Sequence, residues 1–389
     1  MELENPNDLT LTLSPERSIM DAHAAVTDLT AARAVILKIT QYTNEVKTYK
    51  KDDLTITKNS ITIPGAIKSG QGFDIELKLM NTVCTYIARA KSVTIEPYTN
   101  RVITLEIEEI KPHIILPAKK TNSPRNCTFF AVANPEKKDG LVFEGSRDSS
   151  ISDFAFDKYG RLFLLHTPGG STNTEFSSYD NLVNHPQTGS FKNLCIDIET
   201  NTSYYTKSYH IKACPMSWNS FGAETTGVIF DPNNTTAISV GKNYCVGMET
   251  HYNGSTYWYT FKCLNKFDIK NILKEVDIKF SVGVYPSDII IDGDILYVLL
   301  GGASQPNTTL GKSSMKIYSL PDFKLLKTVT GFYNGTKFLG KRDGKLYIAD
   351  KVIRNPPPNT KRLGIYDTLT GKLKFIDVKE FSNEIEFQW

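Results

Sequence analysis

The stretch SDFAFDKYGRLFLLH (Ser152–His166) contains the pattern from which the fold can be inferred. A short apolar run leads into a turn at Asp157 and then into a second apolar run, which is typical of a β-hairpin. The pattern returns as SDIIIDGDILYVLL (Ser287–Leu300), and weaker copies occupy Thr225–Val240 and Thr336–Asp350. A hairpin repeated at intervals of tens of residues predicts a radially repeated sheet, the β-propeller.

Each of these inner hairpins is followed by a further pair of short strands, as a propeller blade requires. These outer pairs are expected at Asn193–Tyr209, Tyr257–Val282, Met315–Thr330 and Leu363–Val378. Strands from Cys127–Gly145 and Ile385–Trp389 would make one further blade from both ends of the region and so remove the exposed sheet edge. This count favours five blades, or six if the long insert before Phe191 contains strands.

The N-terminal part of the chain has a different pattern, in which apolar and polar residues alternate with period two. Strands are expected at residues 8–14, 35–40, 73–80, 86–97 and 102–110, with a hairpin at Asp53–Ile63. Short alternating strands with turn signals between them predict an antiparallel β-sandwich. The Ala-rich residues 20–34 are expected to form a helical turn or a loop.

A boundary between two all-β domains is expected at Lys111–Asn126, where three prolines interrupt the strand pattern. Proline fixes φ and has no N–H to donate to a neighbouring strand, so this segment is predicted to be a stiff linker. We therefore predict a sandwich domain at residues 1–115, a linker at 116–125 and a propeller domain at 126–389.

The totals exclude several classes of protein. Lys and Arg number 45 against 42 acidic residues, and a net charge of +3 does not predict a nucleic-acid partner. The chain has no apolar run of the roughly 18 residues that a transmembrane helix needs. Its polar start, Met1–Asp8, is not a signal peptide. This start fits a cytosolic protein, or an exported one whose leader is absent.

Two resemblances favour export. The order of turns and strands in residues 30–110, including Ser69–Gly72 and Lys91–Pro97, resembles the immunoglobulin-like or transthyretin-like domains of bacterial surface lipoproteins. The inner hairpin, apolar-Asp-x-x-Gly-x-apolar-aromatic, resembles the NHL, SMP-30 and YVTN-type propellers. These resemblances imply an extracytoplasmic protein, at the cell surface or in the periplasm. The polar Asn/Pro/Asp opening also resembles the tether of a bacterial lipoprotein whose acylated cysteine has been cut away.

The residues that could carry catalysis show no convergent pattern. The paired acids of Asp292-Gly293-Asp294 are explained by a tight turn, because Asp-Gly is a favoured turn sequence. The metal ligands of the SMP-30 lactonases have no residue-by-residue match, the six histidines are scattered, and no GxSxG motif occurs. We predict no catalytic residue, metal or cofactor. A hydrolase or lactonase acting in the central tunnel is the alternative.

A binding rim is the more informative possibility. The repeat places Arg147, Trp218, Tyr285 and Tyr333 just before innermost strands, at the mouth of the tunnel. Flat side chains give contact area at low entropic cost. We therefore expect a monomeric, non-catalytic binding or scaffolding protein whose mouth contacts a protein or a glycan. A cytosolic interaction scaffold is a further alternative.

The six cysteines form no CxxC pair and no zinc-type cluster. One pair is expected to be close in space. A three-residue turn at Asn253-Gly254-Ser255 would pair residues whose numbers have a constant sum, and this places Cys245 opposite Cys263. The sequence therefore predicts a hairpin with a disulfide between these two cysteines in an exported protein, and two thiols in a reducing cytosol.

Overall fold

The computed structural model describes residues 8–14, 28–41, 46–64, 70–95, 101–119, 127–136, 141–147, 149–168, 171, 173–180, 184–185, 189, 191–217, 220–229, 235–281, 283–302, 313–352, 360–378 and 386–387. It is all-β and divides into two compact units, Met1–His113 with Tyr159–Arg161, and Ile114–Lys158 with Leu162–Trp389. Its described helices are two single 3-10 turns, η1 (Leu29–Ala31) and η2 (Lys51–Asp53), and neither has the length or apolar character to cross a membrane.

The first unit is built on one continuous series of eight strands, in the order β3-β2-β6-β7-β8-β1-β5-β4. Their bounds are β1 (Leu9–Leu13), β2 (Ala34–Thr40), β3 (Val46–Lys50), β4 (Thr55–Ile56), β5 (Ile61–Ile63), β6 (Gly70–Met80), β7 (Cys84–Ile95) and β8 (Arg101–Pro112). The expected strands are confirmed, and β3 was not foreseen. Of the Ala-rich segment, the structure describes only residues 28–34, which contain η1.

The long strand β8 connects the two halves of this sheet. Its residues 101–105 pair in parallel with β1, and its residues 106–112 pair antiparallel with β7. Alternate residues on both halves are buried, for example Leu11 on β1 and Leu77 on β6, as period-two patterning requires. The hydrogen bonds therefore join all eight strands into one sheet, because β8 belongs to both halves. A sandwich of two separate sheets, as in an immunoglobulin-like domain, stays a prediction.

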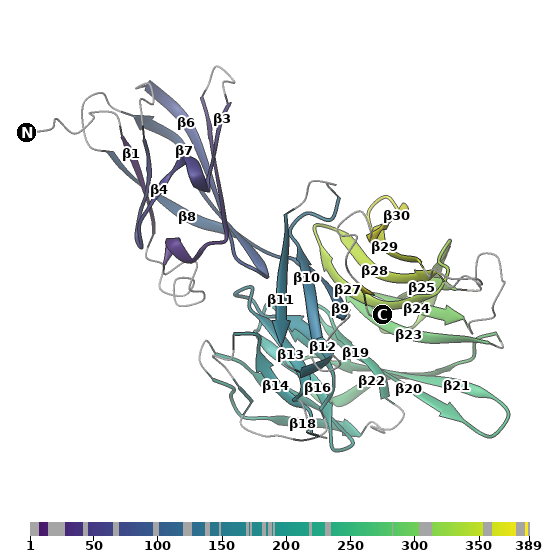
Figure 1. The fold of residues 1–389 in the computed structure, drawn as a ribbon. Coiled ribbons are helices and arrows are strands. Elements are labelled where there is room, and N and C mark those ends of the chain that lie inside the picture. The colour runs from purple at the N-terminus through teal and green to yellow at the C-terminus, as the bar shows by residue number, and fades with distance from the viewer. Residues whose placement is uncertain are drawn as a thin grey trace, which may run out of the picture. The chain divides into compact units, whose positions relative to one another are not determined.

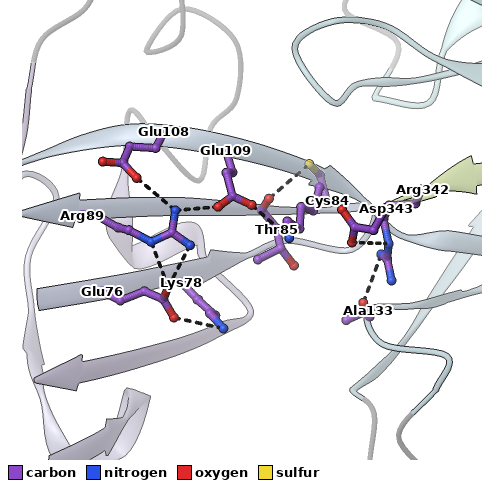
Figure 2. A network of polar contacts seen from close by, with 11 residues as sticks. Glu76, Lys78, Cys84, Thr85, Arg89, Glu108, Glu109, Ala133, Arg342 and Asp343 are labelled. Atoms are coloured by element: carbon purple, nitrogen blue, oxygen red, sulfur yellow. Dashed lines mark hydrogen bonds and ion pairs between the residues drawn. The ribbon is translucent and has the colours of Figure 1, made fainter. Parts of the chain in front are cut away.

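Charged side chains occupy part of the opposite face of this sheet. Arg89 on β7 reaches Glu76 on β6 (2.8 Å) and Glu108 and Glu109 on β8 (3.0 and 2.5 Å), and Lys78 also pairs with Glu76 at 3.1 Å (Figure 2). Partly exposed ion pairs of this kind contribute little stability individually. They give the strands a solvated charged face whose members already have partners.

The described strands of the second unit form six sheets, the blades of a β-propeller (Figure 1). Blade 1 holds β9 (Ile114–Lys119), β10 (Cys127–Val132), β11 (Val142–Arg147) and β31 (Glu386–Phe387); blade 2 holds β12 (Ser149–Phe156), β13 (Leu162–Pro168) and β14 (Glu175–Ser178); blade 3 holds β15 (Lys192–Asp197), β16 (Thr202–Lys207), β17 (His210–Pro215) and β18 (Thr225–Ile229). Blade 4 holds β19 (Thr235–Val240), β20 (Tyr244–Tyr252), β21 (Tyr257–Asn265) and β22 (Asp268–Ile278); blade 5 holds β23 (Val284–Asp292), β24 (Ile295–Gly302), β25 (Ser314–Ser319) and β26 (Lys324–Thr330); blade 6 holds β27 (Gly335–Arg342), β28 (Lys345–Val352), β29 (Thr360–Asp367) and β30 (Leu373–Asp377).

The inner strands of blades 2 to 6 are β12, β15, β19, β23 and β27, and each contacts the next around the ring. Blade 1 closes the ring, because β9 contacts β27 and β10 contacts β12. The expected closure from both ends of the domain is confirmed, since Glu386 and Phe387 pair with Lys119 and Ala118. We call the end of the ring at which these inner strands begin the mouth.

The favoured count of five blades is wrong, and the alternative of six is correct. The inner hairpins at Ser152–His166, Ser287–Leu300 and Thr336–Asp350 are confirmed. However, Asn193–Tyr209 belongs to a blade of its own rather than to the first hairpin, because the insert before Phe191 supplies the short strand β14. The expected hairpin at Thr225–Val240 is also wrong, since its two runs are β18 of blade 3 and β19 of blade 4.

The expected linker at 116–125 begins inside a strand. Ile114, Leu116 and Ala118 on β9 alternate into the buried core of blade 1. This burial outweighs the N–H donor that is missing at Pro117, which pairs with Phe129. The rest of the expected linker, from residue 120, lies outside the described residues.

Candidate functional site at the propeller mouth

Three of the four predicted rim residues lie where an inner strand begins. Arg147 ends β11, two residues before β12; Tyr285 is the second residue of β23; and Tyr333 lies two residues before β27. Trp218 lies outside the described residues. The next described strand after it in the chain is β18, the fourth strand of blade 3 and not an inner strand. The expectation that Trp218 precedes an inner strand is therefore wrong.

Tyr285 is the exposed aromatic residue of this group, with 42% of its surface accessible. A Cβ atom on Gly301 would lie 3.1 Å from Tyr285 Cε2 and 3.2 Å from Asn334 Oδ1. Glycine on β24 therefore leaves room for the Tyr285 ring and the Asn334 amide at one place. The mouth brings together a phenol ring and a carboxamide from neighbouring blades 5 and 6.

The segment that carries Asn334 is fixed by a buried ion pair. Asp350 on β28 is fully buried, and its Oδ1 accepts hydrogen bonds from the backbone N–H groups of Tyr333 (3.0 Å) and Asn334 (2.9 Å). Arg362 on β29 donates from Nε to Asp350 Oδ2 at 3.0 Å. The Arg362 guanidinium also lies 4.3 Å from the Tyr333 ring centroid and 3.8 Å from that of Phe375.

Tyr333 is therefore half-buried against a cation, while the next residue, Asn334, is the one that lies beside Tyr285. Tyr333 was identified from the sequence, and Asn334 was missed. The sequence Phe-Tyr-Asn-Gly (Phe332–Gly335) indicates a turn at Asn334. It does not show that Asn334 lies close to Gly301, because that contact forms only when blades 5 and 6 pack together.

The hairpin β20–β21 adds further aromatic rings, and it extends away from the blade (Figure 1). Tyr252 and Tyr257 are directly opposed, their ring centroids are 4.5 Å apart with planes at 27°, and each is 55% exposed. Tyr259 lies two residues further along the same face and is buried. Burial raises the pKa of Tyr259, and the nearby phenols of Tyr257 and Tyr285 raise it further.

Tyr259 therefore connects the hairpin tip to the mouth. We call Tyr252, Tyr257, Tyr259 and Tyr285 the aromatic strip. Its signal was present in the sequence, as the two aromatic-rich runs that flank Asn253-Gly254-Ser255. From this hairpin, the sequence predicted only the alignment of Cys245 with Cys263.

That alignment is wrong by one residue. Cys245 pairs with Leu264, and Cys263 pairs with Val246, so the two cysteines point to opposite faces of the hairpin. The cause is a four-residue loop, in which Asn253 Oδ1 accepts the Thr256 N–H at 2.9 Å and holds Thr256 outside the strand. Both cysteines are free thiols, and they are buried in different interblade cores.

The centre of the ring carries a second polar group. Asp153 on β12, Asp288 on β23 and Lys337 on β27 all come from inner strands. Lys337 Nζ lies 2.5 Å from Asp153 Oδ1. Burial raises the pKa of Asp288 to about 6; Asp153 adds to this effect, and Lys337 opposes it.

Both carboxylates accept hydrogen bonds from backbone N–H groups of the next blade. Asp153 Oδ2 accepts the Leu194 N–H at 2.7 Å, and Asp288 Oδ2 accepts the Phe338 N–H at 2.8 Å. Each also accepts the N–H of its own following residue through Oδ1, at 3.0 Å from Phe154 and 2.9 Å from Ile289. Such carboxylates hold neighbouring strands in place.

Two catalytic arrangements can be compared with the geometry. Among the described residues, no group of three or more His, Cys, Asp and Glu side chains is placed to hold a metal ion. Ser177 Oγ lies 2.9 Å from His166 Nε2, but Glu175 approaches that same nitrogen, at 3.9 Å. A catalytic triad needs the carboxylate on the other ring nitrogen, and Ser177 and His166 are both buried.

Comparison with known proteins adds little beyond the topology. No protein-family model and no curated protein matches this chain. A solved structure of a functionally unknown protein from Desulfotomaculum acetoxidans is 14% identical and covers 81% of this chain and 95% of its own, with a TM-score of 0.41. Dihydro-heme d1 dehydrogenase NirN (10% identity, 88% and 73% covered, TM-score 0.34) and a Synechocystis apocarotenoid oxygenase (8%, 68% and 78%, TM-score 0.40) are also similar. At these values none of them bears on activity.

Proposed function

We propose that this protein is a monomeric, non-catalytic binding or scaffolding protein that acts outside the cytoplasm. Its propeller mouth would contact a protein or glycan partner. The observation that carries this proposal is the exposed ring of Tyr285 beside the Asn334 amide at the mouth. Tyrosine rings are enriched where binding energy is concentrated, because they supply rigid contact area with a polar edge.

The support beneath this surface is also what a binding site needs. The Asp350–Arg362 pair fixes the backbone at Tyr333 and Asn334 before any partner arrives. A surface that is already ordered loses less entropy on binding than one that must be ordered by its partner. Rigid support from a buried charge pair therefore favours recognition at this edge of the ring.

A retention experiment tests the proposal. Wild-type protein, Tyr285→Ala and the control Phe267→Ala would be immobilised and exposed to a cell-envelope extract of the source organism, separated into proteins and polysaccharides. Phe267 is 74% exposed and lies in the turn after β21, at the end of the ring opposite the mouth. We expect specific retention by wild type and Phe267→Ala and its loss in Tyr285→Ala. Equal retention by all three proteins would refute a binding role for the mouth.

The alternative function, a tunnel hydrolase or lactonase, is favoured by one observation, the raised pKa of Asp288 in the ring centre. Asp288 is, however, hydrogen-bonded through both oxygens to backbone N–H groups. We expect no turnover of a panel of lactones and aryl esters. Turnover that Asp288→Asn abolishes, with melting unchanged, would instead establish the enzyme.

The location outside the cytoplasm rests on the architecture that the sequence resembles. Protease treatment of intact and lysed cells of the source organism would test it. Cleavage in intact cells, or after removal of the outer envelope, is expected. Protection until the inner membrane is broken would favour the cytosolic scaffold.

A further inference from the structure

We propose that the aromatic strip binds an uncharged polysaccharide chain, which would lie along the hairpin β20–β21 and end at Asn334. This inference rests on the proposed binding function and specifies the class of its ligand. It starts from the placement of the strip. Loops that join second and third strands emerge at the mouth, and β20–β21 is such a connection, so its tip and Tyr285 lie at the same end of the ring.

Three tyrosines of the strip share one face of the hairpin. Tyr252 and Tyr257 form a stacked pair at the tip, and the buried Tyr259 follows two residues inward. Tyr285, the second residue of β23, begins the next inner strand at the same end of the ring. Successive residues on one face of a strand are roughly 7 Å apart. The strip is therefore narrow, long and apolar, with hydroxyl groups at its edges.

The charges of the hairpin lie on its other face. Glu249 pairs with Lys262 at 2.9 Å and approaches His251 at 3.8 Å, and His251 stacks on Trp258. The register places these residues on the face opposite Tyr252, Tyr257 and Tyr259. Lys316 lies over the Phe280 ring, 5.3 Å from its centroid, and that ring packs on the buried Tyr259 at 5.5 Å. This cation is therefore at the buried inner end of the strip, away from the exposed pair Tyr252 and Tyr257.

This separation of charge from aromatic surface favours a neutral ligand. An acidic or basic chain would gain from fixed charges beside the rings, whereas a neutral sugar needs none. The C–H faces of a pyranose ring are apolar and can lie flat on a phenol ring, while its hydroxyl groups point outward. The Asn334 amide, which can both donate and accept, is suited to those hydroxyls.

The size of the strip favours a thin chain over a folded protein. An aromatic side chain buries roughly 150–250 Å², so three partly exposed tyrosines offer roughly 300 Å². A stable protein interface needs about 800 Å² from each partner. A linear polysaccharide can use a narrow surface of this size, because it contacts the strip along its length.

The test is co-sedimentation with insoluble neutral polysaccharides (cellulose, β-1,3-glucan and xylan), followed by calorimetry with their soluble oligosaccharides. Pectate, an acidic polysaccharide, serves as the charged comparison. The variants are Tyr257→Ala, Tyr285→Ala, Tyr257→Phe and the control Phe267→Ala. Thermal melting would show that each variant is folded, and the exposed position of Tyr257 at the hairpin tip makes this the expected result.

We expect wild type to bind at least one neutral polysaccharide and not pectate. Each alanine variant should bind at least about tenfold more weakly, whereas Tyr257→Phe and Phe267→Ala should stay within about threefold of wild type. Failure to bind any neutral polysaccharide, or equal binding by the alanine variants, would overturn the inference. If the envelope extract then yields a protein retained through Tyr285, only the ligand class is wrong; if Tyr285→Ala retains everything that wild type retains, the proposed function is wrong as well.

Discussion

The inner strands of blades 2 and 5 contain the same sequence, Ser-Asp followed by apolar residues, and the structure uses it in two ways. In both, the serine is the extra residue of a β-bulge, and its hydroxyl donates to a carbonyl of the paired strand, from Ser152 to Leu165 at 3.1 Å and from Ser287 to Leu299 at 3.2 Å. Bulges redirect the following side chain. In each blade the aspartate after the bulge then reaches the backbone of the next inner strand.

The difference lies in the second partner. Asp153 also pairs with Lys337, which comes from blade 6, whereas Asp288 is buried without so close a cation. Blade 1 lies between blades 6 and 2, and its described inner strand, β31, has two residues. The Asp153–Lys337 pair therefore joins the inner strands of the two blades that flank blade 1. The same motif closes the ring in blade 2 and aligns adjacent blades in blade 5.

Asp153→Ala should have the largest effect, because it removes both the contact to Leu194 and the partner of Lys337. We expect it to lower the free energy of unfolding by about 3–4 kcal/mol, near the lower end for a broken buried pair since Lys337 is 31% exposed. Asp288→Ala should cost about 1–2 kcal/mol, through the loss of the carboxylate that accepts the Phe338 and Ile289 N–H groups. Urea unfolding of both variants measures the difference. Equal losses would show that the lysine contributes nothing to closure.

Removal of residues 386–389 should have the next largest effect. It would delete β31 and its pairing with Lys119 and Ala118, at an expected cost of about 2–3 kcal/mol to the whole propeller. Combined with Asp153→Ala, the loss should differ from the sum of the two by at least about 0.5 kcal/mol, because both act on the same closure. Additive losses would show that the ion pair and the closing strand stabilise the propeller independently.

The sequence predicted the repeating hairpins well, because their signals are local. Alternating apolar residues and Asp-Gly turns located the inner hairpins of blades 2, 5 and 6. The wrong hairpin at Thr225–Val240 came from the turn signal Asp231-Pro232-Asn233-Asn234 in its middle. Turn chemistry shows where the chain can reverse, but it does not show whether the flanking strands pair with each other. Here they belong to different blades.

The candidate site was less predictable, since its contacts cross between blades. Tyr285 was found from its place in the repeat. Asn334 could not be found in this way, because it lies near Tyr285 only where Gly301, on another strand, has no side chain to separate them. The cysteine register failed on a single residue, Thr256, which the Asn253 side chain holds in the loop. A shift of one residue moves every side chain of a strand to the other face.

A pH titration gives the smallest effect and the finest test of the comparison. The Asp288 pKa is raised from 3.8 to about 6 by burial, so between these pH values the folded chain binds more protons than the unfolded chain. The free energy of unfolding should therefore fall as pH rises from about 4 to 6, by about 1–3 kcal/mol from this residue. Asp288→Asn cannot titrate and can still accept from Phe338. Its stability relative to wild type should thus increase by that amount between pH 4 and pH 7, as urea midpoints would show. Because other titrating groups are common to both proteins, a constant difference across this range would show that Asp288 ionises as readily as an exposed carboxyl, and the contrast between blades 2 and 5 would then lie in Lys337 alone.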